Sequence, residues 1–435
     1  MTFRTNEVYG IVRRGVPKTY VSRTDVDDRF LNEITRDQHL VIYGSSKQGK
    51  SSLIQTALQP SDYISVQCAT DWTKHTLYSA ILRQAGVTLK DGTTRTKGSS
   101  SEVTAEIEAE VKAPFFASLI ARLQGRAGTQ RSTSVVLKEI PLDLSRAADV
   151  ISLLEKIKFK KYIVVEDFHY LPASVQRELA TDLKAFYEQS DSSFIIVGVW
   201  LEANRLIVYN GDLASRITSI PADTWKNEEL AEVVRSGQQL LNITFSDEVV
   251  DALVQRAQQN VGTLQEAVRQ LCIQAEIHQT ARDTFHFDDL NAVASAYDYV
   301  ANQLATRYAN AINKFSEGLR DQVLHMYKWL MHAVIHATPD QRRAGLKTAE
   351  IWRHIQSVHP RGTAILQNSV VVALENVAKV QSHAQITPII FDYDESHQRL
   401  SIVDNGFLVY LANTATSEAD AFLATFENER PSSAP

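Results

Sequence analysis

Eight consecutive residues, from Gly44 to Ser51, have the types and the spacing that suit a row of phosphate groups. They read GSSKQGKS, which fits the pattern GxxxxGK followed by Ser or Thr. The two glycines let the backbone turn tightly, so that its N–H groups point inward at phosphates. In this pattern Lys50 reaches the β- and γ-phosphates, and the Ser51 hydroxyl ligates magnesium. The segment therefore predicts a site for ATP and Mg2+. The other predicted nucleotide-binding residues are Ser45, Ser46, Lys47, Gln48, Gly49 and Ser52.

Two adjacent acids, Glu166 and Asp167, follow the apolar run YIVV. A phosphate-binding loop of this kind needs a further acid that holds the magnesium shell and orients a water molecule. We assign Glu166 to the magnesium shell, through a water molecule, and Asp167 to the orientation of the attacking water. The common order is Asp and then Glu, so the sequence leaves open which of the two acts as the base.

The segments that must position these residues alternate between strands and helices. Strands are expected at 39–44, 63–67, within 161–171, at 193–200 and at 216–222. Helices are expected at 24–36, 50–58, 73–85, 146–158 and 173–189. This alternation predicts an α/β fold, a parallel P-loop NTPase sheet with helices on both faces. The near-continuous apolar runs YIVV and FIIVGV fit strands that are buried on both sides.

Composition changes divide the chain into regions. We expect a nucleotide-binding domain over 1–225, a helical lid and connector over 226–315, a winged-helix domain over 316–415 and a flexible tail over 416–435. The last domain is predicted from helices at 319–337, 347–358 and 365–381, followed by a hairpin. A Ser-, Thr- and Gly-rich insertion interrupts the first domain at 88–135. Its basic and apolar part, PFFASLIARL, is either packed on its own domain or available to a membrane surface or a partner.

The bulk composition excludes several classes of protein. The 435 residues carry a net charge of -6, so there is no overall basic field for nucleic acid. The predicted third helix at 365–381 has Lys379 against Glu375, so DNA is a partner that the sequence allows but does not favour. Two distant cysteines suggest neither a disulfide framework nor a zinc site. No signal peptide and no transmembrane segment are visible, and a cytoplasmic protein is expected.

Together, these motifs resemble those of the AAA+ ATPases and their STAND relatives over residues 20–280. The motifs are GSSKQGKS, the strand YIVVED, the later strand FIIVGVW and the segment GDLASRI. The runs around them also resemble a bacterial family usually labelled only as ATP-binding proteins. The resemblance puts Arg216 in the position of an arginine finger that reaches a neighbouring subunit, with Arg205 as the alternative. It implies a homo-oligomer.

Two positions depart from the AAA+ pattern. Trp200 stands where a polar sensor is common, and Glu202 or Asn204 could substitute for it. Gln265 stands where many AAA+ proteins carry a second sensor arginine, and Arg269 lies one turn later. Both departures imply slow hydrolysis, which suits a switch better than a motor.

Two functions follow from the resemblance. The first is an ATP-dependent switch that oligomerises and controls a separate effector or partner protein, as in bacterial antiviral defence. The second is a DNA-handling ATPase similar to replication initiators or transposition regulators. A P-loop kinase is a third reading, but the helical lid and Arg216 argue against it.

Overall fold

The computed structural model describes residues 1–10, 15–36, 38–87, 89, 143–200, 203, 205–223, 225–319, 324–387, 389–395 and 397–413. The predicted insertion over 88–135, apart from residue 89, and the predicted tail over 416–435 lie outside the described residues. Glu202 and Asn204 lie outside them as well.

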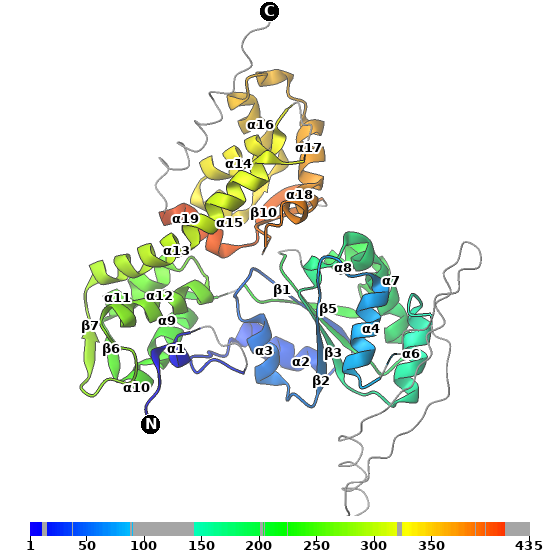
Figure 1. Cartoon of the computed structure of the whole chain (residues 1–435), viewed down its shortest axis with the longest axis horizontal. Helices are drawn as coiled ribbons and strands as arrows, with labels where there is room; N and C mark the ends of the chain where they lie inside the picture. The colour runs from blue at the N-terminus through cyan, green and yellow to red at the C-terminus, as the bar shows by residue number, and fades with distance from the viewer. Residues whose placement is uncertain are drawn as a thin grey trace, which may run out of the picture.

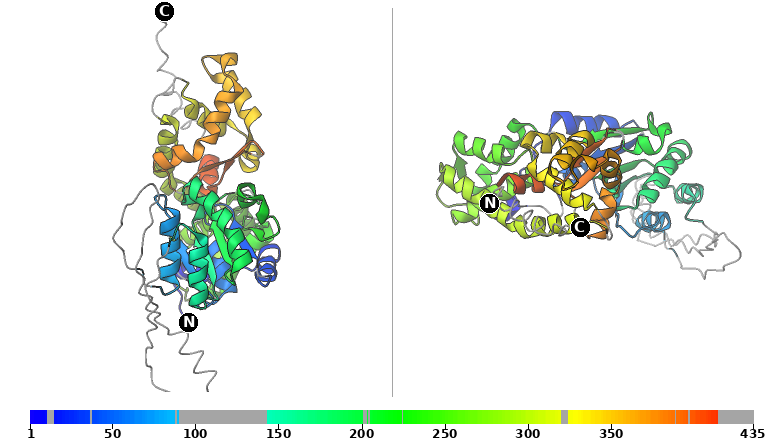
Figure 2. Two further views of the ribbon diagram at one scale, coloured as in Figure 1. Left: turned by 90° about the vertical axis from the view of Figure 1, so that its right-hand side faces the viewer. Right: turned by 90° about the horizontal axis from the view of Figure 1, so that it is seen from above.

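Three regions are visible in Figure 1: an α/β domain, a helical lid and a C-terminal domain coloured yellow to red. Seen from above in Figure 2, the C-terminal domain overlies parts of both other regions. The long helix α13 (Leu290–Glu317) joins the lid to the C-terminal domain. It packs against α11 (Asp247–Arg256) and α12 (Val261–Gln274) of the lid and against α14 (Met326–His336) and α19 (Asn405–Asn413) of the C-terminal domain.

The α/β domain is built on a parallel sheet of five strands in the order β2-β3-β4-β1-β5. The strands are β1 (His39–Tyr43), β2 (Tyr63–Gln67), β3 (Tyr162–Glu166), β4 (Phe194–Gly198) and β5 (Ile217–Pro221). They confirm the five predicted strands and the P-loop NTPase fold. Because all neighbours run parallel, every strand ends at the same edge of the sheet, which we call the carboxyl edge; the opposite one is the amino edge.

Both faces of this sheet are covered, as the apolar strands predicted. Val41 packs into a core with α4 (Lys74–Gln84), α6 (Ala147–Lys156) and α7 (Ala173–Gln189). Its neighbours Leu40 and Ile42 pack into a second core with α2 (Arg29–Ile34) and α3 (Lys50–Ala57). Side chains of successive strand residues point to opposite faces, so one strand serves both cores. The helical elements of this domain are η1 (Thr24–Asp28), α2 (Arg29–Ile34), α3 (Lys50–Ala57), α4 (Lys74–Gln84), α6 (Ala147–Lys156), η2 (Phe168–Tyr170), α7 (Ala173–Gln189), α8 (Arg205–Tyr209) and η3 (Gly211–Leu213).

The lid is a helical domain with one small ribbon of strands. Its elements are α9 (Asn227–Ser236), α10 (Gln238–Leu241), β6 (Ile243–Phe245), α11 (Asp247–Arg256), α12 (Val261–Gln274) and β7 (Phe285–Phe287). The two strands are too short to show a period in the sequence. The first helix of the chain, α1 (Thr5–Val8), also belongs to this core, and Thr5 donates through Oγ1 to the carbonyl of Ile277 at 2.6 Å. The N-terminal residues thus pack on the lid, whereas the sequence placed them with the nucleotide-binding domain.

The C-terminal domain combines helices with a three-stranded antiparallel sheet in the order β8-β10-β9. Its elements are α14 (Met326–His336), α15 (Pro339–Ala344), β8 (Leu346–Lys347), α16 (Thr348–Val358), η4 (Gly362–Ala364), α17 (Gln367–Glu375), α18 (Val377–His383), β9 (Phe391–Asp394), β10 (Arg399–Ile402) and α19 (Asn405–Asn413). The prediction of one helix over 365–381 was wrong. The chain breaks at Asn376, whose side chain donates back to the carbonyl of Val372 at 2.8 Å, and two helices result.

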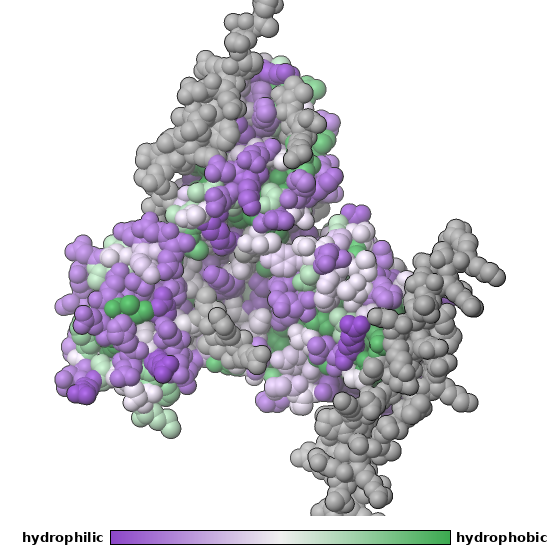
Figure 3. Space-filling view, viewed as in Figure 1, coloured by the Kyte–Doolittle hydropathy of each residue, from purple (hydrophilic) through white to green (hydrophobic). Residues whose placement is uncertain are grey.

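The surface facing the viewer in Figure 3 is mainly hydrophilic to neutral, with small separate hydrophobic patches. Among the described residues, no helix combines the length and the apolar character that crossing a bilayer requires.

Candidate functional site

The phosphate-binding loop connects β1 to α3 at the carboxyl edge. Gly44 has φ +139° and Gly49 has φ +83°, conformations that residues with a Cβ rarely adopt. Gly49 is also the residue from which α3 starts. The loop therefore delivers the N-terminal end of α3 to a cavity that Ser46, Lys47, Gln48, Gly49, Lys50, Ser51 and Ser52 line from one side. Of the predicted loop residues, Gly44 and Ser45 lie behind this lining.

Lys50 is folded back onto the loop. Its Nζ donates to the carbonyl oxygens of Gly44 at 2.8 Å and Ser45 at 2.5 Å. Burial lowers the pKa of Lys50, and the nearby carboxylates of Asp223 and Glu166 act in the opposite direction. Among the described residues, the hydrogen bonds of this buried ammonium group go to carbonyl oxygens. Such a group is well suited to move to a phosphate, because charge-assisted bonds are about twice as strong as neutral ones.

Glu166 ends β3 and faces the start of α3. Ser51 Oγ donates to Glu166 Oε1 at 3.3 Å and Oε2 at 3.4 Å. Burial, and then the charge of Asp167, raises the pKa of Glu166 to about 7. The hydroxyl and the carboxylate are hard oxygen donors, and Mg2+ commonly takes only one or two protein ligands besides phosphate and water. These two residues fit the predicted magnesium site.

Asp167 lies beside Glu166 at the rim of the same cavity. Its backbone is left-handed, with φ +55°, which turns the chain away from the sheet into η2. Gln67, the last residue of β2, donates through Nε2 to Asp167 Oδ2 at 2.9 Å. Sequence reasoning missed Gln67. Its only signal is that it ends the strand next to β3, where it pairs in register with Glu166.

Two further parts of the chain line the cavity, and of their residues the sequence connected only Gln265 with the site. One part consists of Pro17, Thr19, Tyr20, Val21 and Arg23, and the other of Trp225, Val233, Val261, Gly262 and Gln265. Gln265 Nε2 donates to Thr19 Oγ1 at 3.0 Å and joins the two parts. The lid also touches the loop directly, because a Cβ on Gly262 would lie 2.7 Å from Lys47 Cβ.

The two residues that depart from the AAA+ sequence pattern lie in different surroundings. Trp200 is fully buried behind the end of β4, where its ring fills the space of a side chain on Gly198. Gln265 lines the cavity, but Arg269 does not; it forms an ion pair with Glu266.

His169 accepts a hydrogen bond from the amide of Val199 at 3.2 Å, and burial lowers the pKa of His169 to about 3, so this imidazole is neutral.

Arg216 lies far from this cavity along the sheet. It immediately precedes β5 at the amino edge, and its Nη2 donates to Glu188 Oε1 at 2.7 Å. A second guanidinium nitrogen donates to the carbonyl of Asp212. Arg216 therefore takes no part in the nucleotide cavity of its own chain.

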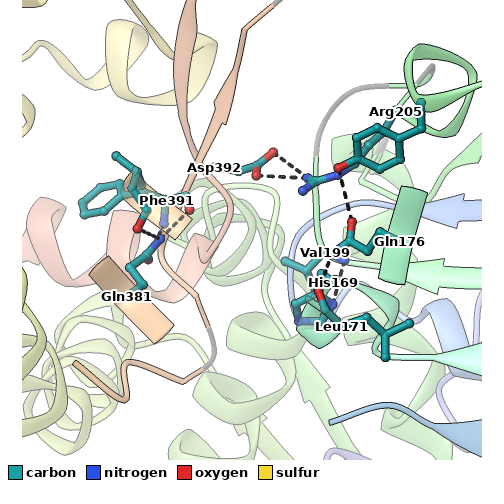
Figure 4. Close-up of polar contacts among 10 residues, drawn as sticks. His169, Leu171, Gln176, Val199, Arg205, Gln381, Phe391 and Asp392 are labelled. Atoms are coloured by element: carbon teal, nitrogen blue, oxygen red, sulfur yellow. Dashed lines mark hydrogen bonds and ion pairs between the residues drawn. The ribbon is translucent and has the colours of Figure 1, made fainter. Parts of the chain in front are cut away.

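The alternative arginine, Arg205, faces the C-terminal domain. Its Nη1 lies 3.0 Å from both carboxylate oxygens of Asp392, which belongs to β9 (Figure 4). The side chains are 19% and 6% exposed, so the pair is partly shielded from water. Close by, the carbonyl of Val403 accepts a long bond of 3.4 Å from the amide of Ser46. The C-terminal domain thus touches both the phosphate-binding loop and the segment after β4.

No protein-family model matches the sequence, and no significant relative is found among curated proteins. In structure, the chain is similar to the Walker-type ATPase PABY2304 of Pyrococcus abyssi. The two are 13% identical, the match covers 93% of this chain and 100% of that chain, and the TM-score is 0.55. This similarity shows the fold of a Walker-type ATPase.

Two further solved structures match over most of the chain. The Orc1 protein of Aeropyrum pernix, in complex with DNA, is 12% identical over 94% of this chain and 95% of that chain, with a TM-score of 0.40. The RuvB Holliday junction branch migration motor of Thermotoga maritima is 10% identical over 91% and 96%, with a TM-score of 0.39.

Proposed function

We propose that this chain binds ATP with Mg2+, hydrolyses it slowly and uses the bound nucleotide to control the position of its C-terminal domain. The observation that carries the proposal is the contact of that domain with the nucleotide site. Val403 accepts a bond from the loop amide of Ser46, and Asp392 pairs with Arg205 beside the end of β4.

The chemistry is assigned to residues at the carboxyl edge. Lys50 leaves its two carbonyls for the β- and γ-phosphates, where it balances negative charge. Ser51 and Glu166 hold the Mg2+, which when bound neutralises phosphate charge. Asp167, kept in place by Gln67, orients the attacking water and accepts its proton. Hydrolysis is slow in this proposal because Trp200 and Gln265 replace the polar sensor and the sensor arginine.

Nucleotide binding would shift the C-terminal domain through the contacts that it shares with the loop. Amide groups of a P-loop bind phosphate oxygens. A triphosphate would therefore compete with the Val403 carbonyl for the amide of Ser46. Arg205 carries a positive charge near the same end of the sheet. When a nucleotide binds, its phosphates would compete with Asp392 for this charge. A ligand shifts such an equilibrium only by its different affinity for the two states. Here the difference comes from contacts that the bound phosphates replace.

Hydrogen–deuterium exchange of the full chain tests this proposal. ATP with Mg2+ should reduce protection in β9 and at the start of α19, and Asp392→Ala should produce the same change without nucleotide. Glu395→Ala, an exposed change just beyond β9, is the control and should have no effect. Unchanged protection of the C-terminal domain in the presence of saturating ATP would contradict the switch.

The proposal extends to assembly and to a partner. We propose that the rearranged chain forms a homo-oligomer in which Arg216 faces the site of the next subunit, and that the oligomer acts on a separate effector protein. A role in bacterial defence would agree with this arrangement. A pull-down from the source organism with and without ATP, followed by mass spectrometry, would identify such an effector.

DNA handling is the alternative function, and α17 does not favour it. This helix, QNSVVVALE, contains no Lys or Arg, while Leu366 just before it is 68% exposed and Val372 is 49% exposed. Binding to DNA phosphates usually relies on several cations. A salt-sensitive increase in fluorescence anisotropy of a labelled duplex would support the DNA reading nevertheless.

A further inference from the structure

Asp223 lies against the entrance of the phosphate-binding loop, although no sequence pattern marks it. β5 and β1 are paired in register up to Pro221 and Tyr43, and the amide of Ala222 extends this pairing to the carbonyl of Tyr43 at 2.8 Å. The residue that follows Ala222 is therefore opposite the residues that follow Tyr43. These are Gly44 and Ser45, the first two residues of the loop.

The carboxylate of Asp223 accepts hydrogen bonds from two groups of Ser45, the amide and the hydroxyl. The amide of Ser45 donates to Oδ1 at 2.6 Å and Oδ2 at 2.7 Å, and the Ser45 hydroxyl donates to Oδ2 at 2.8 Å. A Cβ on Gly44 would lie 2.4 Å from Asp223 Oδ1. The acid thus packs so tightly on the loop that the first position has to be glycine.

The carbonyl side of the same residue is held by Lys50, whose Nζ lies 2.5 Å from the Ser45 oxygen. Ser45 is therefore fixed on two sides, by Asp223 at its amide and hydroxyl and by Lys50 at its carbonyl. In the function proposed above, Lys50 leaves this carbonyl for the phosphates. The hydrogen bonds from Ser45 to Asp223 then remain.

We propose that Asp223 is a positioning residue of the nucleotide site, which keeps the loop entrance in its phosphate-binding shape once Lys50 has turned to the nucleotide. This inference rests on the proposed nucleotide binding. It predicts that the bonds of Asp223 matter more with nucleotide than without, because in the proposed function Lys50 leaves the Ser45 carbonyl when nucleotide binds.

Two substitutions distinguish the effect of the hydrogen bonds between Asp223 and Ser45 from the effect of the negative charge of Asp223. Asp223→Ala removes every bond to Ser45 and leaves a backbone donor without its partner. Asp223→Asn removes the charge but can keep both contacts, because Oδ1 can accept from the amide and Nδ2 can donate to the Ser45 hydroxyl. Asp340→Ala, at a 95% exposed carboxylate in the C-terminal domain, is the matched control.

Calorimetry with ATP and Mg2+, together with thermal unfolding with and without ATP, provides the test. Asp223→Ala should weaken ATP binding by about tenfold, as expected for an unsatisfied donor, and the ATP-induced rise in Tm should become smaller. Asp223→Asn should stay within about threefold of the wild type, since its hydrogen bonds persist. If Asp223→Ala does not fold, Ser45→Ala removes the hydroxyl bond alone and should give a smaller loss in the same direction.

Three results would overturn the inference: wild-type affinity in Asp223→Ala, equal losses in the Ala and Asn variants, or a Tm loss that is the same with and without ATP. A wild-type chain that does not bind ATP would instead refute the proposed function, so the two failures are distinguishable.

Discussion

The two edges of the five-stranded sheet carry charged residues of very different kinds. At the carboxyl edge, Lys50, Glu166 and Asp167 surround one cavity, and burial lowers the pKa of Lys50 and raises that of Glu166. At the amino edge, Arg216 pairs with Glu188, and Lys184 pairs with Asp212 at 2.6 Å. The side chains of these two pairs are between 24% and 59% exposed.

The direction of the strands explains this difference. In a parallel sheet all chain turns that follow strands meet at one edge, which is where open α/β sheets bind ligands. Charges at that edge are held together by the fold, and they lose water. Charges at the amino edge stay in water and contribute little to stability as pairs, about 0–1 kcal/mol each. The charged residues of the amino edge can act on a nucleotide only if it is bound to another molecule.

The largest expected effect is at Lys50. Lys50→Ala should weaken ATP binding by about a hundredfold, because a charge-assisted contact with phosphate is lost. Calorimetry with ATP and Mg2+ measures this effect, and Lys184→Ala at the amino edge is the matched control. An unchanged affinity in Lys50→Ala would end the assignment of the carboxyl edge as the nucleotide site.

The acid pair should separate two steps of the reaction. Asp167→Asn should keep ATP and hydrolyse it about a hundredfold more slowly, because a positioned base is removed. Glu166→Gln should raise the Mg2+ concentration needed for half-maximal hydrolysis. Phosphate release measured across a magnesium titration distinguishes the two. Identical profiles for both variants would leave the division of roles between the acids without support.

How far the sequence could anticipate this edge depends on the kind of signal. The loop from Gly44 to Ser51 and the acids after β3 are local patterns of consecutive residues, and the sequence predicted them together with their strands. Gln67 and Asp223 have no such pattern. Their roles arise because β2 neighbours β3 and β5 neighbours β1, and this strand order is not written in any single segment.

The rest of the cavity lining, apart from Gln265, escaped prediction for a similar reason. Tyr20 and Trp225 are separated by most of the α/β domain in sequence, and both line the cavity because the lid packs against the loop. Conversely, the single helix expected over 365–381 failed for a local reason. Apolar periodicity continues across Asn376, but its side chain ends the first helix by bonding to Val372.

The next prediction concerns pH. The pKa of Glu166 is raised from its ordinary value of 4.5 to about 7, so the folded chain holds this proton more tightly than the unfolded chain. The contribution of Glu166 to stability therefore falls as pH rises from about 4.5 to about 7. Binding of the magnesium complex should change in the opposite sense, because the ionised carboxylate is the ligand. Its affinity should rise by about tenfold at most between pH 6 and pH 8.

Glu166→Gln provides the comparison for both pH effects, because the amide does not titrate. Thermal unfolding and calorimetric titrations should lose the part of their pH dependence that Glu166 causes, while the remaining dependence from ATP itself is common to both proteins. If the wild type and Glu166→Gln have parallel pH profiles, another group is responsible.

The smallest effect on the isolated chain is expected at Arg216, where the comparison between the two edges is most open to test. Removal of an exposed ion pair costs about 0.2–1 kcal/mol, so Arg216→Ala should lower Tm only slightly and leave ATP binding nearly unchanged.

An arginine finger supplied to a neighbouring subunit acts differently, because it stabilises the transition state on that subunit. Such head-to-tail contacts build rings or open helical arrays, and hydrolysis per subunit should then rise with protein concentration. Arg216→Ala should abolish this rise, whereas Glu188→Ala, which breaks the same ion pair but keeps the arginine, should preserve it. Mass photometry with a slowly hydrolysed ATP analogue, beside a concentration series of rates, measures both parts. A monomer whose turnover is independent of concentration would reduce Arg216 to a surface ion pair, and the amino edge would then have no share in the chemistry.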